Sequence, residues 1–173
     1  KGNLMVPVGA VKHSTDKKNF GSSALYFAGT GNYIKVPTGP AGSTFDFGTN
    51  DLTWEFWMNS MQPPAGATRN MLFSYDGTSP QGFWGMRLAG TSDNSGALFS
   101  TATDGTNVYW AILTNSQIHD GAWHHCATVR EGALASVFVD GILVGSDSTA
   151  SGDIAHDTNQ HFSIGTQGRT LEN

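Results

Sequence analysis

Charged residues are scarce in this sequence. Asp, Glu, Lys and Arg together make up 13% of its 173 residues, about half the share usual in a soluble domain. The surface must therefore consist largely of Ser, Thr, Asn, Gln and Gly, as is common in secreted β-proteins and coat proteins. The nine Lys and Arg residues are dispersed, and the net charge is −5. A surface that follows nucleic-acid phosphates needs clustered cations, so we expect no nucleic-acid partner.

Cysteine occurs once, so no internal disulfide can form. Cys126 lies in an alternating segment, and we expect it to pack as a small apolar group inside a strand. A catalytic thiol with His125 as its base is the alternative, but neighbours in a strand point to opposite faces. Long apolar runs are also missing: none approaches the roughly 20 residues that span a bilayer. We therefore expect no membrane insertion.

Helical periodicity is absent as well, because no window of about twelve residues keeps an apolar stripe at helical spacing. Alternation takes its place, most clearly in residues 52–59. Leu52, Trp54, Phe56 and Met58 fall on one face of this segment, and Thr53, Glu55, Trp57 and Asn59 fall on the other. This is the pattern of an antiparallel strand with one buried face and one wetter face.

Ten further segments alternate in the same way and are separated by glycine-containing turns. They are residues 24–27, 33–36, 71–75, 83–88, 97–101, 108–113, 123–130, 136–139, 142–146 and 161–164. Asp-Gly pairs such as Asp140-Gly141 supply the positive φ angles that tight hairpin turns need. About eleven strands joined in this way predict an all-β fold, a two-sheet antiparallel sandwich or jelly roll. Residues 60–70 and 146–159 are expected to be surface loops.

Four motifs in this chain resemble those of the laminin-G-like jelly-roll family, which has the concanavalin A-like lectin/glucanase architecture. They are FGSSALYFAGTGNYI at residues 20–34, FDFGTNDLTWEFW at 45–57, WHHCATVR leading to VFVDG at 123–141, and SIG at 163–165. The resemblance covers about residues 20–166 and implies that residues 1–173 form one jelly-roll domain. It also implies an extracellular location or a place on a virion surface, since the motif sequences are most similar to those of phage structural proteins.

The chain departs from this family at both ends. The family continues beyond the motif at 163–165 into a closing strand, and no opening strand is evident before Gly9. We therefore expect this sequence to be a piece of a longer polypeptide, or its outermost strands to come from a neighbouring subunit. A jelly roll without an edge strand exposes unpaired backbone groups, which favours strand donation or an oligomeric assembly.

The same architecture carries glycoside hydrolases, so catalysis is an alternative function for this chain. Hydrolysis by the usual route needs two carboxylates facing one cleft, about 5 to 9.5 Å apart. Glu55 is the only acid on its predicted strand face, where its neighbours are Thr53 and Trp57. The other glutamates, Glu131 and Glu172, lie by a predicted turn and near the end of the sequence. We expect the chain not to be an enzyme.

The candidates for metal binding are histidines and turn aspartates. His124 and His125 are adjacent in a predicted strand and point to opposite sides, so we expect framework histidines bonded to the backbone rather than a chelating pair. Related jelly rolls often bind calcium, which here would lie near Asp51, Asp76, Asp93 or Asp104. No dense Asp-x-Asp-x-Asp-Gly motif occurs, and Ala28 stands where the family often has Asp. No other cofactor is predicted.

The candidates for ligand binding are aromatic residues with polar neighbours on the same strand face. They are Trp57 with Glu55 and Asn59, Phe83 with Arg87, and Tyr109. Sugars stack on such rings while nearby polar groups orient the hydroxyls. The alternative for Trp57 is that it completes the packing at a sheet edge.

Two functional hypotheses follow. The first is a structural or adhesion module of a phage or similar particle, such as a decoration, fibre or tail domain. Its partners would be other coat subunits and, on the host, a glycan. The second is a carbohydrate-binding module of a secreted bacterial protein. A glycan-degrading enzyme is a distant third.

Overall fold

The computed structural model describes residues 4–29, 31–37, 47–61, 70–76, 83–88, 97–103, 107–154 and 161–165. These residues form thirteen strands and no helix. None of them therefore belongs to a helix that could cross a membrane.

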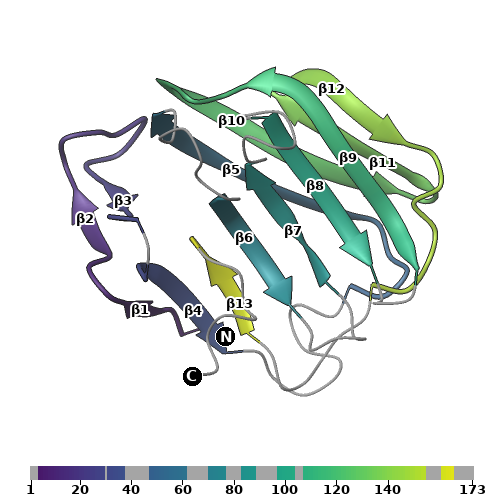
Figure 1. The fold of residues 1–173 in the computed structure, drawn as a ribbon, viewed down its shortest axis with the longest axis horizontal. Coiled ribbons are helices and arrows are strands. Elements are labelled where there is room, and N and C mark those ends of the chain that lie inside the picture. The colour runs from purple at the N-terminus through teal and green to yellow at the C-terminus, as the bar shows by residue number, and fades with distance from the viewer. Residues whose placement is uncertain are drawn as a thin grey trace.

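The strands form two large sheets and a separate hairpin (Figure 1). The larger sheet has the order β1 (Val6–Val8), β4 (Tyr33–Pro37), β13 (His161–Ile164), β6 (Asn70–Asp76), β7 (Phe83–Leu88), β8 (Ala97–Thr103) and β9 (Val108–Gln117). The smaller sheet has the order β12 (Ile142–Asp147), β11 (Leu134–Val139), β10 (Asp120–Glu131) and β5 (Leu52–Met61). The hairpin pairs β2 (Lys12–Ser14) with β3 (Ala24–Tyr26).

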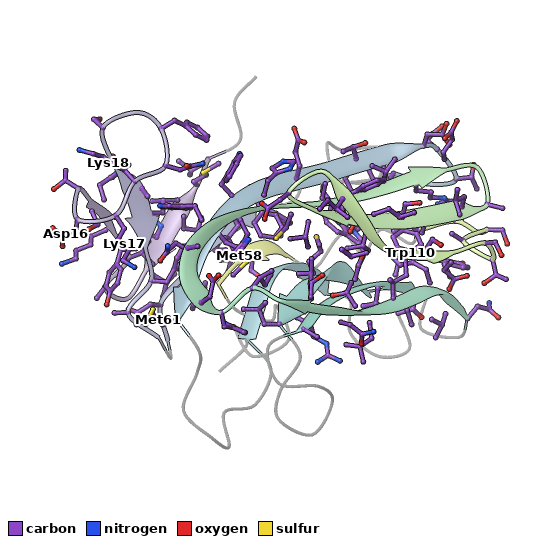
Figure 2. The ribbon with its side chains drawn as sticks, turned by 90° about the horizontal axis from the view of Figure 1, so that it is seen from above. Asp16, Lys17, Lys18, Met58, Met61 and Trp110 are labelled. Carbon is purple, nitrogen blue, oxygen red and sulfur yellow. The ribbon has the colours of Figure 1, made fainter. Side chains whose placement is uncertain are left out.

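Every paired strand is antiparallel, and several neighbours lie far apart in the sequence. β13 is inserted between β4 and β6, and β10 pairs with β5 rather than with β9. The two large sheets pack face to face, so the predicted jelly-roll sandwich is confirmed (Figure 2).

All eleven predicted strands are present, and two short strands were missed. β1 contains Pro7, and β2 has no apolar residue, so neither shows the alternation of apolar and polar residues that predicts a strand. β1 also corrects the expectation that no strand precedes Gly9, because it pairs with β4 along that edge of the larger sheet. Its central residue, Pro7, has no N–H to donate and therefore suits an edge strand.

The core between the two large sheets is rich in tryptophan. Trp84 of β7 is 2% exposed and stacks on Trp54 of β5 with ring centroids 4.9 Å apart. Trp110 of β9, labelled in Figure 2, is fully buried. Its ring centroid lies 5.8 Å from that of Trp54. Cys126 of β10 is also fully buried, which confirms that it packs as a core residue.

The tight turn predicted at Asp140-Gly141 is confirmed. Both residues have positive φ, 51° for Asp140 and 79° for Gly141, as a two-residue hairpin of this kind requires. The turn joins β11 to β12 and brings the Asp140 carboxylate back to the start of β10. There Asp140 Oδ1 accepts a hydrogen bond of 2.9 Å from the backbone N–H of His125.

Candidate functional site

The strand register gathers a group of polar and aromatic side chains on the outer face of the smaller sheet, away from the core. We call this group the Trp57 face. It consists of Glu55, Trp57 and Asn59 of β5, with His125 and Trp123 of β10. Trp57 pairs with His125, and Asn59 pairs with Trp123. The intervening residues of β5 point inward, and Leu52 and Met58 are buried among them. The predicted alternation of this strand is therefore confirmed.

Trp57 is the most prominent aromatic side chain of this face. It is 44% exposed although it is central along a ten-residue strand. The His125 ring lies 5.2 Å from it, and the Phe20 ring meets it edge-on at 6.2 Å and 84°. Phe20 comes from the loop between β2 and β3 and is itself 70% exposed. Trp57 therefore keeps a large open surface between two aromatic neighbours.

A carboxylate and an imidazole lie beside Trp57. His125 Nε2 is 3.2 Å from Glu55 Oε2, with the Glu55 side chain 63% exposed and that of His125 26% exposed. The expectation that His125 is a buried framework histidine bonded to the backbone is therefore wrong. Its side chain is directed to the outer face, where a carboxylate is within reach. Alternation placed both residues on strand faces, but only the pairing of β5 with β10 brings them together.

Asn59 lies at the end of the Trp57 face and has structural partners. Lys17 Nζ donates to Asn59 Oδ1 at 3.1 Å and to the Gly121 carbonyl at 3.5 Å. The Asn59 side-chain amide also donates to the Gly121 carbonyl. Figure 2 shows Lys17 in the loop of the hairpin, at the end of the sandwich where Met61 lies. Asn59 and Lys17 therefore connect this loop to the smaller sheet, and their side-chain polar atoms already form hydrogen bonds within the protein.

The second group of predicted ligand-binding residues lies elsewhere. Arg87 is on β7 of the larger sheet, so the structure does not bring it to Trp57. Phe83 is on the same strand, and its side chain lies outside the described residues.

Tyr109 was expected on an exposed strand face, and this expectation is wrong. The residue is only 9% exposed and belongs to the core, whereas Val108 is 65% exposed. The cause is an irregularity of register: Thr103 pairs with Val108 and Ala102 pairs with Trp110, which leaves Tyr109 as an extra residue on β9. Such a bulge reverses the alternation on one side of it.

Of the predicted calcium ligands, Asp51 is the one whose side chain lies within the described part of the chain. Asp51 Oδ1 accepts a hydrogen bond of 2.7 Å from the backbone N–H of Gly132, so it supports the turn between β10 and β11. The side chain of Asp76, and all of Asp93 and Asp104, lie outside the described residues. Within the described ranges no three His, Cys, Asp or Glu side chains form a group that could hold a metal. Calcium binding stays a prediction.

His124 is held between two carboxylates at the start of β10. Its Nδ1 is 2.8 Å from Asp140 Oδ2, and its Nε2 is 3.1 Å from Asp120 Oδ1. An ionised carboxylate can only accept hydrogen bonds, so both ring nitrogens donate when His124 carries its second proton. Partial burial alone would lower the pKa of His124, but the bonds to Asp140 and Asp120 outweigh it and raise the pKa. The framework prediction for His124 is corrected too, because its side chain bonds carboxylates rather than the backbone.

Cys126 has the environment of an inert thiol. Burial raises its pKa to about 12, whereas a reactive cysteine needs a lowered pKa and access to solvent. His125 lies on the other side of the sheet, next to Trp57, and offers it no base.

Comparison with known proteins places this geometry in a family. The sequence profile of the laminin-G-like family described as the concanavalin A-like lectin/glucanases superfamily matches residues 28–172. No curated protein matches the chain.

Three solved structures illustrate the likeness in fold. The binding domain of Paraclostridial Mosquitocidal Protein 1 has a TM-score of 0.73 and 15% identity, covering 96% of this chain and 40% of that one. Domain 4 of AbnA, an extracellular arabinanase from Geobacillus stearothermophilus in complex with arabinotriose, has a TM-score of 0.65 and 17% identity, covering 96% and 74%. Domains LG4-5 of the mouse laminin alpha1 chain have a TM-score of 0.56 and 14% identity, covering 75% and 33%.

This chain spans less than half the length of the toxin and laminin chains that it matches. The profile match extends over most of the sequence, and the fold agrees with it. The chain belongs to the laminin-G-like family of the concanavalin A-like lectin/glucanases superfamily.

Proposed function

We propose that this chain is a non-enzymatic carbohydrate-binding module of extracellular type, which holds a glycan against the Trp57 face. The observation that carries the proposal is the open Trp57 ring beside the Glu55–His125 pair. An indole presents a flat apolar surface to the C–H groups of a sugar, and a carboxylate accepts hydrogen bonds from its hydroxyls.

The similar structures lend support of a general kind. One of them is a toxin binding domain, and another is an arabinanase domain in complex with arabinotriose. Sites on a shared fold differ between proteins, so these likenesses support binding as a class of function and leave the ligand to this chain's own residues.

A non-enzymatic role is supported by the surroundings of Glu55. The register places Ala127 opposite it, and its neighbours on the same strand face are Thr53 and Trp57. None of these supplies the second carboxylate that glycoside hydrolysis requires.

A particle-surface role is the second candidate, and it is favoured by exposed apolar residues at the opposite edge of the smaller sheet. Ile142 and Leu143 of β12 are 68% and 55% exposed. In an assembly, such residues would be covered by a neighbouring subunit. Analytical ultracentrifugation of the purified chain tests this role: a defined oligomer that Leu143→Ala dissociates supports it, and a monomer at all concentrations contradicts it.

The direct test of glycan binding is an array of immobilised glycans, probed with and without a calcium chelator. The variants are Trp57→Ala and the control Val108→Ala, which removes a more exposed apolar side chain from the larger sheet. We expect reproducible binding to one class of sugar, lost in Trp57→Ala and retained in Val108→Ala. Loss of binding in chelator would add a calcium site. The proposal would be overturned if the folded protein bound no glycan on the array, or if Trp57→Ala bound as well as the native chain.

A further inference from the structure

We infer that the ligand of the Trp57 face is an uncharged oligosaccharide that lies across the strands and reaches Phe138 on β11. This inference rests on the proposed function and adds two properties of the ligand, its length and its charge. The first property comes from the arrangement of side chains across the smaller sheet, and the second from the charges around Trp57.

One row of outer-face residues crosses all four strands of the smaller sheet. Ala127 pairs with Glu55 on one side and with Phe138 on the other, and Phe138 pairs with Leu143. Trp57 stands next to this row, two residues from Glu55 along β5. Phe138 belongs to the outer face because its strand neighbours Val137 and Val139 are both buried in the core. Aromatic side chains thus lie at two places on the same face.

The residue between these two aromatic side chains is small. Ala127 is 6% exposed, and its methyl group is too short to stand as high as an indole or a phenyl ring. The larger side chains of β5 and β11 therefore provide most of the apolar contact for a ligand lying over β10.

The separation of the two rings sets the length of the ligand. Neighbouring strands are about 4.8 Å apart, so β5 and β11 are separated by roughly 10 Å, and the two-residue offset of Trp57 from the row adds about 7 Å along the strands. A monosaccharide on Trp57 cannot also touch Phe138 across this distance. A chain of two or three sugar units can contact both.

The charges around Trp57 favour a neutral ligand. Glu55 is a largely exposed carboxylate, and Asp120 and Asp140 add two more at the same end of the sheet, 57% and 45% exposed. Lys17 donates to the neutral groups of Asn59 and Gly121 and keeps its charge, and His124 lies between the two aspartates. Even when His124 is protonated, the three carboxylates outnumber these two side chains. A carboxylate or sulfate on the sugar would meet repulsion, whereas neutral hydroxyls can donate to Glu55.

The test is isothermal titration of the whole chain with neutral arabino-, xylo- and cello-oligosaccharides of one to four units, and with oligogalacturonates of the same lengths. For the neutral sugar that binds, we expect affinity to rise roughly tenfold from one unit to three. Phe138→Leu, which keeps an apolar side chain but removes the ring, should abolish most of that rise. Oligogalacturonates should bind about tenfold more weakly, and Glu55→Gln should narrow this difference.

Thermal unfolding of each variant shows whether it is folded, and Val108→Ala serves as the control. Equal affinity for one and three units, or an unchanged rise in folded Phe138→Leu, would overturn the inferred length. Tighter binding of the oligogalacturonates would overturn the inferred charge. In either case, loss of binding in Trp57→Ala would leave the proposed function standing. If the folded chain bound no sugar in the titrations and none on the glycan array, both the proposed function and the inferred ligand would be overturned.

Discussion

Arg130 is the most deeply buried charged side chain among the described residues, at 3% exposure. Its guanidinium donates to three backbone carbonyls, those of Gly152 at 2.8 Å, Gly48 at 3.3 Å and Gly132 at 3.3 Å. These carbonyls belong to three different connecting segments. One side chain therefore fastens the loops that close this end of the sandwich.

We predict that Arg130→Met lowers the free energy of unfolding by about 2 to 4 kcal/mol, because three partly buried hydrogen bonds from a charged donor are lost. Chemical denaturation followed by tryptophan fluorescence measures the change. The control is Glu131→Gln at the exposed neighbouring position, where we expect a change of less than about 0.5 kcal/mol. Equal stability of Arg130→Met and the native chain would contradict the role assigned to this side chain.

His124 makes stability depend on pH in a defined direction. Its pKa is raised in the folded chain by the bonds to Asp140 and Asp120, so the folded state holds the proton more tightly than the unfolded state. The resulting stabilisation is complete below the unfolded pKa of about 6.5 and is lost as pH rises through the folded pKa. His119 acts in the opposite direction, because burial lowers its pKa and disfavours its protonated form.

We therefore predict that the stability difference between the native chain and His124→Gln is larger at pH 5.5 than at pH 8.5. Taking the difference removes the contribution of His119, which both proteins share. Urea denaturation at the two pH values provides the measurement. A stability difference that is equal at the two pH values, or larger at pH 8.5, would refute the stabilising ion pairs of His124 with Asp120 and Asp140.

Single residues were predicted well where burial alone decides their role. Cys126 in an alternating apolar segment is such a case. The partners of His125 and His124 could not be predicted, because Glu55 and Asp140 reach them only through strand pairing and a turn. Sequence spacing carries no signal for such contacts between distant segments.

At the scale of elements, the β9 bulge and the segment that follows β12 depend on each other. Gly152 has a φ of 131°, and a Cβ built there would lie 2.1 Å from Tyr109 Cε1. The buried Tyr109 ring therefore occupies the space in which any other residue would place its side chain. The bulge positions the ring, and the glycine accommodates it.

We predict that Gly152→Ala destabilises the fold by about 2 to 4 kcal/mol, through both backbone strain and the clash. Gly132→Ala is a matched control, since its φ is also positive, at 57°, but nothing lies within 4 Å of a Cβ there. It should cost only about 1 kcal/mol. Adding Tyr109→Ser to Gly152→Ala should recover part of the loss attributable to the clash. Additive effects in this double-mutant cycle would contradict the coupling.

Alternation and turn residues were sufficient to predict eleven of the strands, because each signal is local. They could not reveal the bulge at Tyr109, which is defined only by the partner strand β8. Nor could they identify β1 and β2, because β1 contains a proline and β2 has no apolar residue. The family motifs supplied the architecture that local patterns leave open.

At the scale of the molecule, two sheets pack around a tryptophan-rich core, and the smaller sheet also carries aromatic side chains on its outer face. The loop of the β2–β3 hairpin rests on that sheet through Lys17 and Phe20. Two regions of this sheet therefore differ in chemistry. The Trp57 face combines the Trp57 ring with polar groups, and the edge strand β12 is mainly apolar. The first supports glycan binding, and the second supports contact with a neighbouring subunit.

The central claim, a sugar stacked on Trp57, can be measured at the five tryptophan side chains of the chain. In a ¹⁵N-labelled sample, each indole N–H gives one NMR signal, and Trp57→Phe identifies the signal of Trp57. We predict that a neutral trisaccharide selected by titration shifts this signal, while those of buried Trp84 and Trp110 stay in place. Binding of the sugar without a change at Trp57, or with changes confined to backbone signals of the larger sheet, would contradict the account.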